Sequence, residues 1–117
     1  MRAVAAAHAL HAVARMALRL ASPLRAKRIV DAVGRRMPRL LAHEARAVAN
    51  AIDSRGTCLS RAMTVAAMVP GAAVVIGVDP LARRPLFGHA WVELAGQPLR
   101  PGDVDGFEIA RLVTDQP

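Results

Sequence analysis

The sequence predicts an α+β fold in which a helical N-terminal half, residues 1–69, packs on a small antiparallel sheet. Apolar residues of this half recur at helical spacing between capping and proline signals. After Pro70-Gly71 the pattern changes to β-branched and alternating runs, which are typical of strands, over residues 72–104. A chain of 117 residues is long enough for one hydrophobic core and too short for two, so we expect a single domain over residues 1–117.

The first helix is predicted from two faces at helical spacing. Its polar face carries His8, His11, Arg15 and Arg19. Its apolar face, which we expect to pack on the protein, carries Leu10, Val13, Ala17 and Leu20. A helix lying in a membrane interface is the alternative. The stretch 3–14 is too short to span a bilayer and is interrupted by two histidines, so we predict no signal sequence and no stable membrane insertion.

The next two helices are predicted from proline and glycine signals. Ser22-Pro23 reads as an N-cap followed by proline at the first helical position, and Gly34 ends that helix. Its apolar stripe is Ala26, Ile29, Val30 and Val33. Pro38 is expected to open the third helix, which the run 53–56 ends. The apolar stripe of this helix is Leu41, Ala45, Val48 and Ile52.

A fourth helix, from Cys58 to Val69, follows a predicted Thr57 N-cap and has almost no polar residues, so we expect it to be buried on most sides. Residues 73–78 form a β-branched run typical of a central strand. A second strand over residues 89–94 alternates, Ala95-Gly96 forms a turn, and a third strand begins at Pro98. A short terminal helix is expected over residues 106–113.

Charge and composition limit the classes of function. Sixteen basic and nine acidic residues give a net charge of +7, which suits either a solvated arginine-rich surface or steering of an acidic partner. No zinc-finger, basic-zipper or aromatic RNA-reading pattern accompanies the charge, so we do not expect nucleic acid as a partner. The single cysteine excludes an internal disulfide and fits a reducing cytosol, so we expect a cytoplasmic protein.

Cys58 is the first candidate for chemistry, because it is predicted to begin a helix. The positive end of the helix dipole favours thiolate over thiol, and the free N–H groups there can bind an oxyanion. The dipole contributes only ~0.3–1 kcal/mol, so a nearby imidazole must do most of the activation. The competing interpretation is a small buried hydrophobic residue.

His89, at the start of a predicted strand, is the natural base. The other histidines lie on predicted helices, and neither His8-x-x-His11 nor His43-Glu44 completes a metal ligand set, so no metal is predicted. A nucleophile on a helix start with an imidazole on a strand is the arrangement of papain-like and transglutaminase-like enzymes.

A base of this kind needs an acidic group that orients its second ring nitrogen. A three-residue loop, 95–97, would place His89 opposite Asp103, whereas a two-residue loop would place Gly102 there and Asp103 one step along. Asp103 is therefore the candidate acid and Asp105 the reserve. The run 103–106 is also compatible with an ordinary turn.

Three segments together resemble the transglutaminase-like leader peptidases of lasso peptide biosynthesis. They are Cys58-Leu59-Ser60-Arg61-Ala62, Val75-Ile76-Gly77-Val78, and His89-Ala90-Trp91-Val92-Glu93 with its Gly96 turn. The resemblance covers residues from about Thr57 to the Asp103 region, and the helical half agrees in general character. It implies a transglutaminase-like, papain-like core.

The resemblance implies a hydrolase, a cysteine protease that removes the leader from a ribosomally synthesised precursor in RiPP maturation. Cys58 would be the nucleophile, His89 the base and Asp103 the orienting acid, with no cofactor and no metal. The implied partners are the precursor peptide, a separate leader-recognition protein and the lasso cyclase. Two other activities remain open: an acyltransferase using the same triad, and a non-catalytic protein that only binds the precursor.

Overall fold

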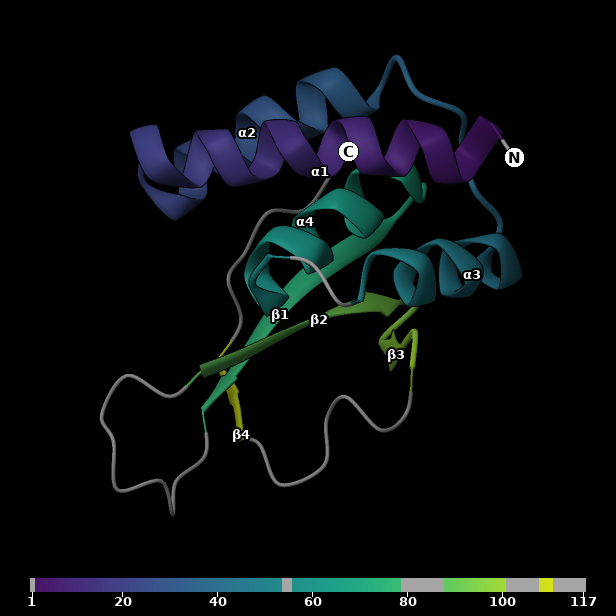
Figure 1. Ribbon diagram of the computed structural model, residues 1–117. Helices are drawn as coiled ribbons and strands as arrows, with labels where there is room; N and C mark the ends of the chain where they lie inside the picture. The colour runs from purple at the N-terminus through teal and green to yellow at the C-terminus, as the bar shows by residue number, and fades with distance from the viewer. Residues whose placement is uncertain (1, 54–55, 79–87, 101–107, 111–117) are drawn as a thin grey trace.

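Four helices lie on one side of an antiparallel sheet (Figure 1) in the computed structural model, which describes residues 2–53, 56–78, 88–100 and 108–110. The helices are α1 (Arg2–Leu20), α2 (Pro23–Gly34), α3 (Ala42–Ile52) and α4 (Cys58–Met68). The strands are β1 (Ala72–Val78), β2 (Gly88–Leu94), β3 (Gln97–Pro98) and β4 (Glu108–Ala110), in the spatial order β3-β2-β1-β4. The predicted α+β class is confirmed.

Helix α4 is the centre of the core, because it contacts the other three helices and also β1 and β2. Eight of its eleven residues are buried, as its lack of polar residues predicts. Gly34, the last residue of α2, lets the two helices approach closely: a Cβ on it would lie 2.7 Å from the Ala67 Cβ. The buried helix therefore holds its first turn in a fixed place relative to the sheet.

Helix α2 begins and ends where the sequence predicts. Ser22 Oγ accepts a hydrogen bond from the Arg25 N–H at 3.4 Å, and Pro23 is the first helical residue. The predicted apolar stripe is wrong at Ile29, which is 41% exposed. The buried face instead includes an ion pair: Lys27 Nζ lies 2.7 Å from both carboxylate oxygens of Asp31. Two opposite charges at i and i+4 neutralise each other, so both side chains can be buried in an apolar interface. The spacing of the apolar residues alone does not indicate such a buried pair.

The predicted polar face of α1 is wrong at His11, which is 2% exposed. The buried residues of this helix are Ala7, Leu10, His11, Ala14 and Ala17. Leu20, expected to pack, is 79% exposed at the helix end. The side that packs is set by the neighbouring helices, and an alanine-rich helix offers small residues on several sides. No helix in the described part of the chain has the length and apolar character needed to cross a bilayer.

Helix α3 starts at Ala42, four residues after Pro38, so the predicted start is wrong. The intervening segment caps the end of α4 instead. The Leu40 N–H donates to the Met68 carbonyl at 2.8 Å, and Arg39 Nη1 donates to the Ala67 carbonyl at 3.0 Å. The last carbonyls of a helix have no partner within that helix. The segment before α3 supplies partners for the Ala67 and Met68 carbonyls, which it could not do if it were the first turn of α3.

The β1–β2 hairpin is in the register Val74↔Val92 and Gly77↔His89, which makes β1 a central strand between β2 and β4 as predicted. The β2–β3 turn has two residues, Ala95 and Gly96, with φ values of 53° and 77°. The register Leu94↔Gln97 follows the two-residue alternative. The position that this register places opposite His89 lies outside the described residues.

The predicted terminal helix over 106–113 is wrong within the described part of that segment. Residues Glu108–Ala110 form β4, which pairs antiparallel with Ile76, Gly77 and Val78 of β1. A helix of eight residues is marginal on its own, whereas a strand here hydrogen bonds an edge of β1 that would otherwise be open.

Candidate active site

Cys58 is the first residue of α4 and is half-buried. The predicted Thr57 N-cap is confirmed: Thr57 Oγ1 accepts from the Ser60 N–H at 3.1 Å, and Ser60 Oγ accepts from the Thr57 N–H at 3.1 Å. This reciprocal capping box uses two of the free groups of the first turn. The amides of Cys58 and Leu59 remain at the open end of the helix, with no acceptor among the described residues.

The thiol of Cys58 lies against the edge of β2. Its sulfur accepts a hydrogen bond from the Ala90 N–H, with 3.4 Å between the two atoms. Ala90 directly follows His89, so the contact places the start of α4 beside the backbone of β2 next to the histidine. Among the described residues, β3 pairs with β2 at Glu93 and Leu94, and the Leu99 N–H donates to the Val92 carbonyl at 2.8 Å, whereas Ala90, nearer the start of the strand, meets α4.

A small cavity of about 30 Å³ has both Cys58 and His89 in its wall. Cys58 and His89, the nucleophile and base proposed from the sequence, therefore share one cavity. A space of this size is on the order of one or two water molecules. A group as small as a carbonyl fits a space of this size.

The alternation of β2 places His89, Trp91 and Glu93 on one side of the strand. The rings of His89 and Trp91 have centroids 6.0 Å apart with planes tilted by 32°. Trp91 is buried, and its Nε1–H donates to Glu93 Oε2 at 3.2 Å. A buried carboxylate is costly unless hydrogen-bonded, so this contact accounts for an acidic residue inside the strand.

Two arginines of the cavity wall, Arg61 and Arg100, are site residues that the sequence analysis missed. Arg100 Nη1 lies 3.1 Å from Asp53 Oδ1, and Arg61 Nε lies 3.8 Å from the same oxygen. Arg61 follows Cys58 at i+3, a spacing that places both residues on one face of α4. This spacing could have identified Arg61 as a site residue from the sequence. Arg100 carried no such signal, because it reaches the site through the β2–β3 hairpin.

The candidate acids Asp103 and Asp105 lie outside the described residues, so the role of either remains a prediction. Among the residues that the structure does describe, no three histidine, cysteine or carboxylate side chains are grouped as metal ligands. The described site thus consists of a helix-start thiol, a strand histidine and two arginines around one small cavity.

Comparison with known proteins adds one match. Residues 1–111 match the protein family described as the transglutaminase-like superfamily. No curated protein and no solved structure matches the chain. The match extends over the helical half, where the sequence analysis found only a general likeness. With nearly the whole chain covered, this protein belongs to the transglutaminase-like superfamily.

Proposed function

We propose that this protein is a cysteine peptidase that removes the leader from a ribosomally synthesised precursor in lasso peptide biosynthesis. The observation that carries the proposal is the shared cavity of Cys58 and His89, with the Cys58 sulfur 3.4 Å from the Ala90 nitrogen. Membership of a superfamily with cysteine protease-like and acyltransferase-like chemistry supports the reaction class. The leader as substrate rests on the resemblance of the cysteine, Ile-Gly-Val and His-Ala-Trp-Val-Glu segments.

In the proposed reaction, His89 accepts the thiol proton of Cys58 and the sulfur attacks the scissile carbonyl carbon. The negative charge on the carbonyl oxygen is stabilised by the open amides of Cys58 and Leu59. When the C–N bond breaks, His89 donates its proton to the leaving amine. Water, deprotonated by His89, then attacks the thioester, which releases the new carboxyl end and restores the thiol. Asp103, or Asp105 in reserve, would orient the imidazole.

Product mass distinguishes this peptidase from its two alternatives. We expect the purified protein and precursor to give two peptides whose summed mass exceeds that of the precursor by one water. An acyltransferase using the same groups would instead join the acyl part to an added amine. A non-catalytic binding protein would retain the intact precursor. Either of these last two results contradicts the peptidase, and mass spectrometry of the reaction mixture decides among the three.

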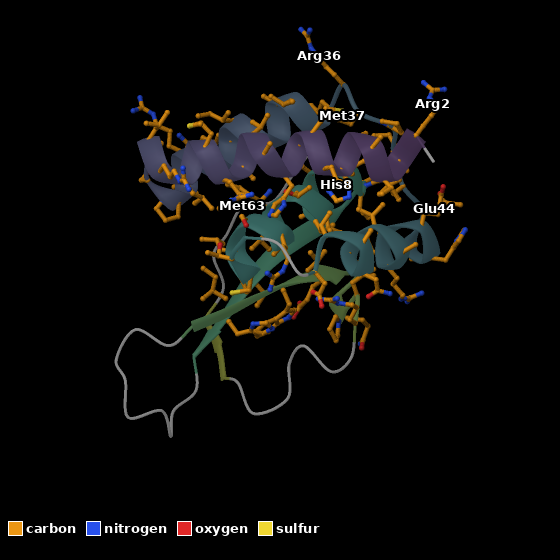
Figure 2. All side chains as sticks on the ribbon, in the orientation of Figure 1. Arg2, His8, Arg36, Met37, Glu44 and Met63 are labelled. Carbon is orange, nitrogen blue, oxygen red and sulfur yellow. The ribbon has the colours of Figure 1, made fainter. Side chains whose placement is uncertain are left out.

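The same proposal includes a separate leader-recognition protein and a downstream cyclase. A groove of about 660 Å³ at one end of the helical layer supports electrostatic docking of acidic groups on the leader or on its recognition protein. Within the described part of the chain, its lining carries Arg2, Arg36 and Arg39 and one acidic residue, Glu44. The Glu44 carboxylate already accepts from the Leu41 N–H at 3.0 Å. Figure 2 shows Arg2 and Arg36 extending away from the helical layer.

We therefore expect cleavage by the protein alone to be slow and to rise strongly when the leader-recognition protein is added, because tethering raises the effective concentration of the cleavage site. The double variant Arg2→Glu/Arg36→Glu should lower the partner-stimulated kcat/KM about tenfold, and moderate salt should lower it in the unmodified protein. The matched control is Arg25→Glu/Arg28→Glu, which makes the same charge change at exposed positions of α2 outside the groove. Full activity without partner, insensitive to salt, would contradict this docking.

A further inference from the structure

We propose that His11 is a positioning residue for Cys58: its imidazole fixes the first turn of α4, which carries the thiol. The inference rests on the proposed role of Cys58 as nucleophile. His11 comes from the middle of α1 and is 2% exposed, and its Nε2 lies 2.9 Å from Ser60 Oγ. Ser60 is two residues after Cys58 and forms half of the capping box that begins the helix.

The hydrogen bonds of the Ser60 hydroxyl assign the proton of His11. A hydroxyl has one hydrogen to donate and two lone pairs to accept with. Ser60 Oγ donates to the Thr57 carbonyl at 2.9 Å and accepts from the Thr57 N–H at 3.1 Å. One lone pair remains, so His11 Nε2 is the donor and carries the hydrogen in this network. Every hydrogen-bonding site of the Ser60 hydroxyl is then used.

Gly56, in the loop before α4, makes room for this pair. A Cβ on Gly56 would lie 2.6 Å from Ser60 Oγ and 2.9 Å from the His11 ring, and the residue has a φ of +63°. The approach to α4 thus passes directly against the imidazole. The histidine joins three parts of the chain at one point: α1, the residue before the N-cap, and the first turn that presents the thiol.

This placement has a consequence for chemistry beyond core packing. The Thr57–Ser60 turn sets the direction of the Cys58 sulfur and of the open amides of Cys58 and Leu59. Misplacing a reacting group by about 1 Å costs on the order of a hundredfold in rate. A donor that fixes Ser60 therefore supports thiol reactivity, whereas a histidine that only filled the core would affect stability alone.

The test compares His11→Gln, His11→Asn and His11→Leu. A glutamine amide nitrogen reaches roughly the place of Nε2, whereas the shorter asparagine falls short of it and leucine has no donor. Because Cys58 is the single cysteine, its alkylation by iodoacetamide reports on this thiol alone. We expect alkylation per folded molecule at neutral pH to be about two- to fivefold slower in the Leu and Asn variants and restored in the Gln variant. The other titratable or charged groups that the described part of the cavity wall contains are His89, Arg61 and Arg100, and these are the same in all three variants.

Cleavage kinetics with the precursor give a second measurement. In His11→Leu, kcat should fall about tenfold while KM stays unchanged. The double variant His11→Leu/Ser60→Ala should have a kcat only slightly lower than that of His11→Leu, because the two residues act through the same hydrogen bond. Equal or faster alkylation in all three variants, with only stability reduced, would overturn the proposal and leave His11 as a core residue. If His11→Leu does not fold, the Gln and Asn pair decides. The alkylation pattern needs no peptide, so a protein that shows it but cleaves nothing would refute the peptidase and retain the positioning role.

Discussion

Cys58→Ala and His89→Ala should each reduce precursor cleavage to background, a loss of more than about a thousandfold in kcat. The first removes the group that forms the thioester, and the second removes the group that moves the proton. Because the two act as a unit, the double variant should be no worse than either single one. The measurement is single-turnover cleavage followed by mass spectrometry, with thermal unfolding recorded for each variant.

The matched control is His43→Ala, which removes an exposed imidazole on α3 and should leave cleavage unchanged. Asp103→Ala should have an effect that is comparable to that of His89→Ala or milder, since an orienting acid does not react itself. Full activity in Asp103→Ala together with loss of activity in Asp105→Ala would reassign the acid and leave the mechanism intact. Substantial cleavage by Cys58→Ala would refute the cysteine mechanism.

The largest effect on folding is expected from Asp31→Ala. The Lys27 side chain has 0% exposure, and its Nζ is held at 2.7 Å by the Asp31 carboxylate. Removing the aspartate leaves an uncompensated charge inside the helical layer, which typically lowers the free energy of unfolding by about 3–5 kcal/mol. Denaturant unfolding followed by circular dichroism measures this loss.

Two comparisons make the Asp31 result specific. The double variant Lys27→Met/Asp31→Leu removes both charges and should recover most of the stability, because an apolar pair of similar volume is commonly neutral or better. Asp53→Ala makes the same side-chain change in the exposed ion pair with Arg100 and should cost less than about 1 kcal/mol. The explanation by an unpaired buried charge would be wrong if Asp31→Ala lowered the free energy of unfolding only slightly. It would also be wrong if the double variant lowered that free energy by a large amount.

Signals within a few residues predicted much of this fold. Ser22-Pro23, Thr57 and the Ala95-Gly96 turn act through backbone groups of their own neighbours, so their effect does not depend on the rest of the molecule. The β-branched strand β1 and the almost wholly apolar helix α4 were also predictable locally, because their composition alone indicates that they are buried. Cys58 and His89 were candidates for the same reason: a helix start and a strand are local features.

The tertiary structure decided which surfaces meet. His11 and Lys27 are polar, and their burial depends on partners: Ser60, 49 positions away, and Asp31, within the same helix. The start of α3 depends on carbonyls at the end of α4, and β4 depends on the open edge of β1. The contact of Cys58 with Ala90 likewise requires the first turn of α4 to lie beside the first half of β2. Local sequence determines the types of elements, but packing free energy is summed over residues far apart in the chain, and only the folded structure shows which of these pairs form.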